Sequence, residues 1–204
     1  MQYIRKHWYD LGGFLALLCC IYLYVNRHAL SPYSFLMWAS FISLCLHQWE
    51  EYRFPGTFPG MLNKVMFKSN IPDRYPLNTN TAFIINTGLG WLFYLMAALL
   101  AEKAVWLGLA TILVSAGNVG AHIFLFNIKG KTIYNAGMAT ALFLFLPLVF
   151  YFFYVLHKYD LASTDDIWIG GLLGVLLNTI GIFKLIDWLK DTNTSYVFEK
   201  RNVK

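Results

Sequence analysis

The chain has 204 residues, of which 58% are hydrophobic, 18% aromatic and only 13% charged, and its mean hydropathy is +0.50. This composition excludes an ordinary soluble domain and is typical of an integral membrane protein. Helices are the expected spanning elements, because about 20 apolar residues cross a hydrocarbon core while satisfying their own backbone hydrogen bonds. The predicted fold class is therefore all-α, a polytopic helical bundle in the membrane.

Hydrophobic runs predict about six transmembrane helices in a single domain that covers residues 1–204. The first run follows Arg5 and Lys6 but has no small-residue cleavage site after it, so we expect a retained helix rather than a signal peptide. The six runs are Tyr9 to Val25, Tyr33 to Tyr52, Thr81 to Ala101, Val105 to Ile128, Asn135 to His157, and Ile167 to Leu189.

The basic residues between these runs predict the orientation of the chain. Twelve lysines and arginines fall at the N-terminus, in the second and fourth loops and in the tail, whereas the opposite side has only Arg27, Lys103 and Lys158. By the positive-inside rule, both termini are predicted to be cytoplasmic in a multi-pass protein of the cell membrane. Because topology explains the formal charge of +5, we expect no nucleic-acid partner.

The end of the second run carries the densest titratable chemistry in the sequence. His47, Glu50 and Glu51 fall within five residues, and helical spacing lets them share one face, with His47 and Glu51 one turn apart. Ionisable side chains at membrane depth are costly unless they are paired or hydrated, and they usually mark function. These three residues are therefore the candidate catalytic residues.

Other polar residues are predicted to lie in the same half of the bilayer. In the predicted topology, the third run begins there with Asn86, and the fourth ends there with Asn118 and His122 on one face. The fifth run begins there with Asn135, and Lys184 is spaced to pair with Asp187 near the end of the sixth. A shared cavity near the cytoplasmic leaflet is the interpretation we favour.

The loop of residues 53–80 is long and contains the repeated tripeptide Phe-Pro-Gly at residues 54–56 and 58–60. Proline and glycine in this pattern predict turns. A long structured loop is often a lid, although a solvated connector fits the length equally well.

The stretch His47-Gln48-Trp49-Glu50-Glu51 resembles the signature of the HXXEE-domain family, a group of small polytopic membrane proteins. The segment from Asn118 to His122 is similar to the later polar helix of that family. The resemblance covers a core of about residues 33–190. It implies which residues matter and does not imply a reaction.

The residues suit two kinds of catalytic site. In the first, His47, Glu51 and His122 bind a divalent transition metal, Zn²⁺ or Fe²⁺, and Glu50 is a general base. In the second, no metal is present, and one of two crowded carboxylates holds a proton with a histidine as its complement. Asn86, Asn118 and Asn135 would then bind an oxygen of the substrate or a developing oxyanion.

We expect a membrane-embedded enzyme, hydrolase-like or isomerase-like, whose partner is a lipid or another membrane-soluble small molecule at the cytoplasmic leaflet. The alternatives are an ion or small-molecule transporter, a substrate-binding subunit without catalysis, and a membrane scaffold. Transporters often have internal repeats and broken helices at the midplane, and the sequence shows neither. Oligomeric state, including a homo-oligomer, stays open.

Overall fold

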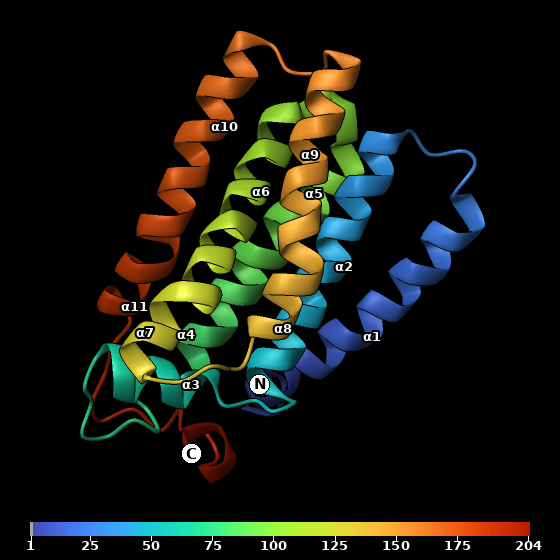
Figure 1. Ribbon diagram of the computed structural model, residues 1–204. Coiled ribbons are helices and arrows are strands. Elements are labelled where there is room, and N and C mark those ends of the chain that lie inside the picture. The colour runs from blue at the N-terminus through green and yellow to red at the C-terminus, as the bar shows by residue number, and fades with distance from the viewer. Residues whose placement is uncertain (1) are drawn as a thin grey trace.

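The computed structural model describes residues 2–204 and contains only helices and connecting segments in that range. Consecutive helical segments form long rods that run back and forth, and Figure 1 shows both chain ends at the same end of the bundle. In chain order the rods are α1 (Gln2–Asn26); α2 (Pro32–Tyr52); α4 (Thr79–Phe83), η2 (Ile84–Trp91) and α5 (Leu92–Leu100); α6 (Val105–Gly120), η4 (Ala121–Leu125) and α7 (Phe126–Gly130); α8 (Met138–Thr140), η5 (Ala141–Phe145) and α9 (Leu146–Tyr159); α10 (Thr164–Leu176), η6 (Leu177–Lys184) and α11 (Leu185–Trp188).

Four helices are long and apolar enough to cross a membrane, which confirms the predicted class of protein. They are Tyr3–Asn26, Thr79–Gly130, Met138–Tyr159 and Thr164–Trp188. The second of these extends over 52 residues and is divided by the 3₁₀ turn η3 (Ala101–Ala104), where the chain reverses. Helix α2 is not among the four, and its last two turns carry the polar residues His47, Gln48, Glu50 and Glu51.

Helix starts follow from local sequence. The Ser31 hydroxyl accepts a hydrogen bond from the Ser34 amide, and Pro32 occupies the first turn of α2, where a missing N–H costs nothing. A capping box formed by Ser163 and Asp166 begins α10. The predicted start of the fifth helix is wrong by three residues, because Gly137 has a φ of +101° that an α-helix does not accommodate. Asn135 therefore lies in the preceding loop.

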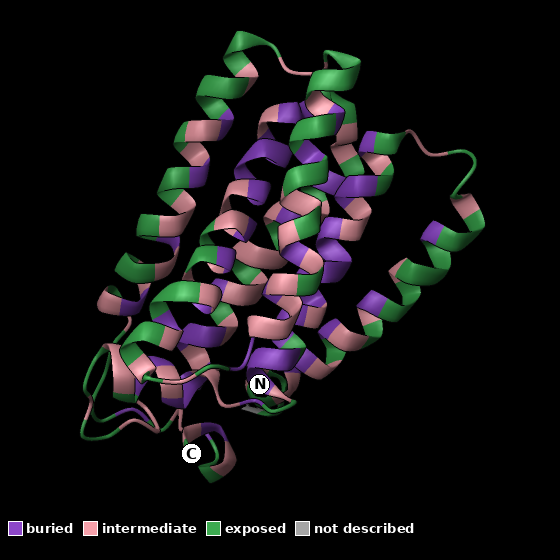
Figure 2. Ribbon diagram, viewed as in Figure 1, coloured by how far each residue is buried: buried purple, intermediate pink, exposed green. Residues whose placement is uncertain are grey.

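Small residues let the rods approach closely. Gly170 and Gly174 of α10 face α6, and a Cβ atom at Gly174 would lie 2.8 Å from the Cβ of Leu113. Glycines four residues apart are a common way to bring membrane helices together. Figure 2 shows buried residues gathered on the central rods that contain α2 and α6, with exposed residues along the outer faces of α1, α9 and α10. Much of this outer surface is hydrophobic, including Leu17, Phe150 and Leu172, as expected for contact with lipid.

The end of the bundle that holds both termini is covered by loops. The segment after α2 forms α3 (Phe58–Gly60) and the π-turn η1 (Met61–Met66), and the C-terminal tail ends in the 3₁₀ turn η7 (Lys200–Val203). The Asn202 amide donates hydrogen bonds to the carbonyls of Tyr52 and Gly56, at 3.2 and 2.7 Å. The long loop is thus held by the tail directly below the last turn of α2.

The close contact between α10 and α6 yields a stability prediction. A Gly174→Leu substitution should force the two helices apart and lower the free energy of unfolding by about 1–3 kcal/mol, a typical cost of overpacking. Unfolding in detergent, followed by scanning fluorimetry, measures this. Gly171→Leu is the matched control, because a Cβ at Gly171 meets no atom within 4 Å. Equal effects of both substitutions would show that the α6–α10 contact does not stabilise the fold.

Candidate metal centre

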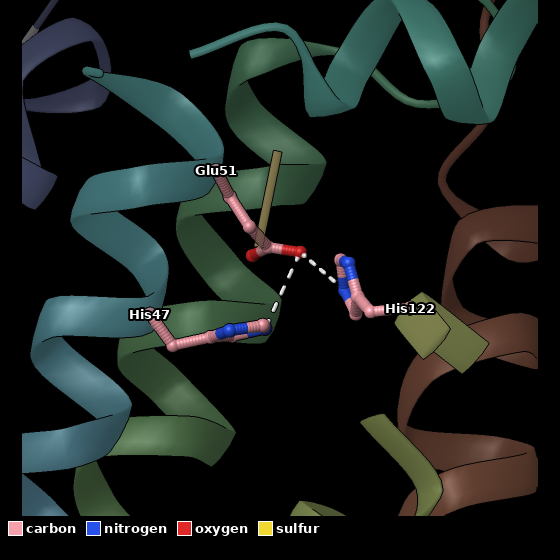
Figure 3. Close-up of side chains that lie close together, drawn as sticks. All are labelled: His47, Glu51 and His122. Carbon is pink, nitrogen blue, oxygen red and sulfur yellow. Dashed lines mark ion pairs between the residues drawn. The ribbon is translucent and has the colours of Figure 1, made fainter. Parts of the chain in front are cut away.

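Three titratable side chains meet in the half of the bundle that holds the termini. One carboxylate oxygen of Glu51, Oε1, lies 3.6 Å from Nε2 of His47 and 3.3 Å from Nε2 of His122. Figure 3 shows this oxygen facing both imidazole rings. All three residues are buried, with His122 fully inaccessible to solvent. The three side chains predicted as metal ligands are therefore brought together from α2 and η4, although Glu51 and His122 are 71 positions apart in sequence.

Local helical geometry explains how these side chains converge. His47 and Glu51 are four residues apart on α2, so they project from the same face. His122 lies in η4, where the helix widens into a π turn, a local change of geometry that is frequent at functional sites. The two imidazole rings are nearly perpendicular, with centroids 4.8 Å apart.

The hydrogen bonds of Asn135 fix the tautomer of His122. The Asn135 amide nitrogen donates to the carbonyl of His122 and to Oδ1 of Asn127, both at 2.8 Å. The Asn135 oxygen must therefore be the group that faces Nδ1 of His122, at 2.7 Å, and it accepts the proton of that nitrogen. In the neutral ring, Nε2 then presents an unprotonated lone pair to Glu51.

His47 is held in the same tautomer by Thr140. The Thr140 hydroxyl donates to Oε2 of Glu50 at 2.6 Å, so its oxygen is free to accept from Nδ1–H of His47 at 2.9 Å. Within residues 2–204, Nε2 of neither His47 nor His122 has a hydrogen-bond partner, and both atoms are buried.

Two lone pairs and a carboxylate oxygen that face one another in a buried space repel unless a positive charge lies among them. A buried anion without a partner is also costly by itself. A bound cation or a proton shared among these atoms resolves both problems. The site thus has the electrostatic requirement of a cation site.

The donor atoms also fit a transition metal. In a tetrahedral site with ligand bonds of about 2.1 Å, donor atoms are about 3.4 Å apart, close to the two measured Nε2–Oε1 distances. Donor atoms of the three residues all lie within 4.8 Å of one another. Two imidazoles and one carboxylate leave a position open, as in catalytic zinc and non-haem iron sites. The Nδ1–H bonds to Thr140 and Asn135 are the supporting bonds that metal-binding histidines usually make.

Glu50 turns away from this cluster and organises the neighbouring loop. Its carboxylate accepts hydrogen bonds from the Ala139 and Thr140 amides, the Thr140 hydroxyl and the Tyr134 hydroxyl. Burial of the Tyr134 hydroxyl, together with its bond to Glu50, raises the pKa of Tyr134, so the phenol stays a donor. Of the two carboxylates, Glu51 is the one that faces the cavity.

Gly137 supports both histidines from the same loop. A Cβ atom there would lie 2.4 Å from Cε1 of His122 and 2.9 Å from Cε1 of His47. Only glycine combines this close approach with a φ of +101°. Gly137 and Thr140 were not identified from the sequence. The feature that could have indicated them is a glycine and a threonine close to the start of an apolar helix.

A cavity of about 160 Å³ opens from the site, and it is lined by His47, Glu51 and His122. Asn86 and Asn118 line it as well, which places two of the three predicted substrate-binding residues at its wall. Asn135 does not line the cavity, because its amide is engaged by His122 and Asn127. The predicted Lys184–Asp187 pair is present at 2.9 Å on an exposed surface.

The bonds of the Thr140 hydroxyl can be tested by substitution. A Thr140→Val change keeps the shape of the side chain but removes the acceptor for Nδ1–H of His47 and the donor to Glu50, and leaving these buried groups unpaired should cost about 1–3 kcal/mol of unfolding free energy. Thr87→Val is the control, because the Thr87 hydroxyl bonds only the backbone of its own helix at Phe83. Unfolding in detergent compares the two; a loss at Thr140 no larger than at Thr87 would contradict the assigned bond.

Comparison with known proteins agrees with the motif on which this site is built. The family described as proteins of unknown function with an HXXEE motif matches residues 38–152, which include both histidines and both glutamates of the site. Neither the curated proteins nor the solved structures contain a significant match to the chain. The family match covers more than half of the chain, so the protein belongs to the HXXEE family.

Proposed function

We propose that this protein is a membrane-embedded metalloenzyme, hydrolase-like or isomerase-like, that acts on an amphiphilic substrate. The observation that carries the proposal is the convergence of two buried imidazole nitrogens without hydrogen-bond partners on one carboxylate oxygen at the wall of a cavity. The arrangement favours a bound cation, because without added positive charge it places like partial charges together in a buried space.

In this proposal, His47, Glu51 and His122 bind Zn²⁺ or Fe²⁺. Such an ion would polarise a carbonyl oxygen or lower the pKa of a bound water, which is the chemistry that the protein side chains lack. Glu50 and Asn135 are positioning residues, since Glu50 acts on His47 through Thr140, and Asn135 acts directly on the ring of His122. Asn86 and Asn118, at the cavity wall, are in a position to orient polar groups of the substrate.

The surroundings support a substrate from the membrane rather than from water. The site is enclosed by helices whose outer faces are hydrophobic. At the end of the bundle that holds the termini, loops cover the site. We further propose that the six rods all span the cell membrane with both termini in the cytoplasm. The sequence places twelve lysines and arginines on the side of the termini, and this excess of basic residues supports the orientation.

Elemental analysis of detergent-purified protein tests the proposal. The wild type should contain close to one zinc or iron per chain, and His47→Ala and His122→Ala should each reduce it to background, because each removes one of three ligands. His28→Ala is the control, since His28 lies in the loop between α1 and α2, outside the cluster. It should retain the metal.

A second readout separates loss of metal from loss of folding. Added Co²⁺ should raise the unfolding midpoint of metal-stripped wild type, because a ligand that binds only the folded state stabilises it. It should also produce visible d–d absorption that Glu51→Gln weakens and Glu50→Gln leaves in place. A folded wild type that binds no metal and shows no cobalt spectrum would eliminate the metal and favour a proton shared by Glu51 and the histidines.

A further inference from the structure

The cavity beside the cluster extends well beyond the polar residues. It runs between η2 on one side and the rods of α6 and η6 on the other, and η2, η4 and η6 all contribute to its wall. Large hydrophobic side chains make up much of this wall, among them Leu89, Phe93, Leu177 and Phe183.

The cavity combines one cluster of ionisable side chains with apolar walls. His47, Glu51 and His122 form that cluster, and the neighbouring Gln48 is already engaged by Asn86 and by the indole N–H of Trp91. Such a space favours a molecule with one polar head and a hydrocarbon tail, because most polar groups of a uniformly polar ligand would find no hydrogen-bond partner along the wall.

Access to the cavity is asymmetric. Toward the covered end of the bundle, the lining residues Leu62, Leu77 and Ile186 are all buried. On the side between η2 and η6, Phe183 lines the cavity and is still 52% exposed on the outer, hydrophobic surface of the bundle. Ile84 and Ile180 on the same two segments are also exposed. On this side, the wall of the cavity therefore reaches the outer surface that lipid chains would contact.

The size of the cavity limits what it can hold. A cavity of about 150 Å³ in another protein accommodates benzene, so this one, at about 160 Å³, has room for roughly six carbon atoms. That is enough for the first part of a single alkyl chain and too small for the ring system of a sterol or for two chains side by side. The rest of a single chain can continue past Phe183 into the membrane.

We infer that the cavity is the tail subsite for a single-chain amphiphile, which enters from the membrane between η2 and η6 and places its head beside Glu51 and His122. The inference rests on the proposed function only for the chemistry performed on the head. Gly181 lines the cavity where η6 contacts η2, and a Cβ there would lie 3.2 Å from Cδ1 of Leu89, so a larger side chain at this position would fill the space between the two segments.

A photoreactive long-chain alcohol with a diazirine in its alkyl chain tests the subsite. Its uncharged head does not need a metal for binding. After irradiation of protein in nanodiscs, mass spectrometry should find adducts on residues 85–93 and 177–186 that excess hexadecanol displaces, while adducts on the lipid-facing side of α9 are not displaced. Uniform labelling without displacement would overturn the inference, as would displacement by cholesterol equal to that by hexadecanol.

Two variants connect the labelling to this cavity. Gly181→Leu should reduce the displaceable labelling at least tenfold by narrowing the passage, whereas Gly171→Leu, on the same rod but facing open space, should label as the wild type does. Full labelling of a folded Gly181→Leu protein would contradict the route. His122→Ala should lose metal and keep the labelled subsite, so failure of the metal proposal and failure of the tail subsite give different results.

Discussion

The arrangement of this protein depends on the meeting of three buried donor atoms, Nε2 of His47, Nε2 of His122 and Oε1 of Glu51. Each of these atoms can bind a proton or a metal ion. None of them can hydrogen-bond to bulk water instead, because all three residues are buried. Their proximity therefore requires either a cation or a shared proton. The neighbouring rods and residues 134–140 hold these atoms in place, and the cavity lies directly beside them.

The segment of residues 134–140, which joins the end of the preceding loop to α8, has a large part in this. It supplies Asn135 to one histidine, Thr140 to the other, and Gly137 in close contact with both rings. Glu50 holds this segment through four hydrogen bonds, so the two adjacent glutamates have different roles: Glu51 meets the histidines, and Glu50 holds the segment that orients them. A division of this kind is common around metal ligands, whose orientation depends on the residues behind them.

The helices themselves are adapted at the level of the site. π-turns occur in η2, η4 and η6, and each of these segments lines the cavity. In a π turn the backbone hydrogen bonds join residues five apart instead of four. The side chains therefore leave the positions that a regular α-helix would give them. Toward the opposite end of the bundle, Gly170 and Gly174 bring α10 tightly against α6. The cavity thus occupies the part of the bundle where the helices are irregular.

The sequence by itself determined the class of protein, the approximate extent of the helical rods and the shared face of His47 and Glu51, because hydrophobic run length and one-turn spacing are local properties. His47 and Glu51 had to share a face of α2. His122 was predicted to join them, because the predicted topology places it in the same half of the bilayer. Tertiary structure alone decided which glutamate faces the cavity, since Glu50 and Glu51 are adjacent and either face of α2 was available. It also decided that Asn135 supports His122 from a loop, and that Thr140 and Gly137 belong to the site. These roles depend on contacts between residues about 10 to 90 positions apart, and helical periodicity carries no information about such contacts.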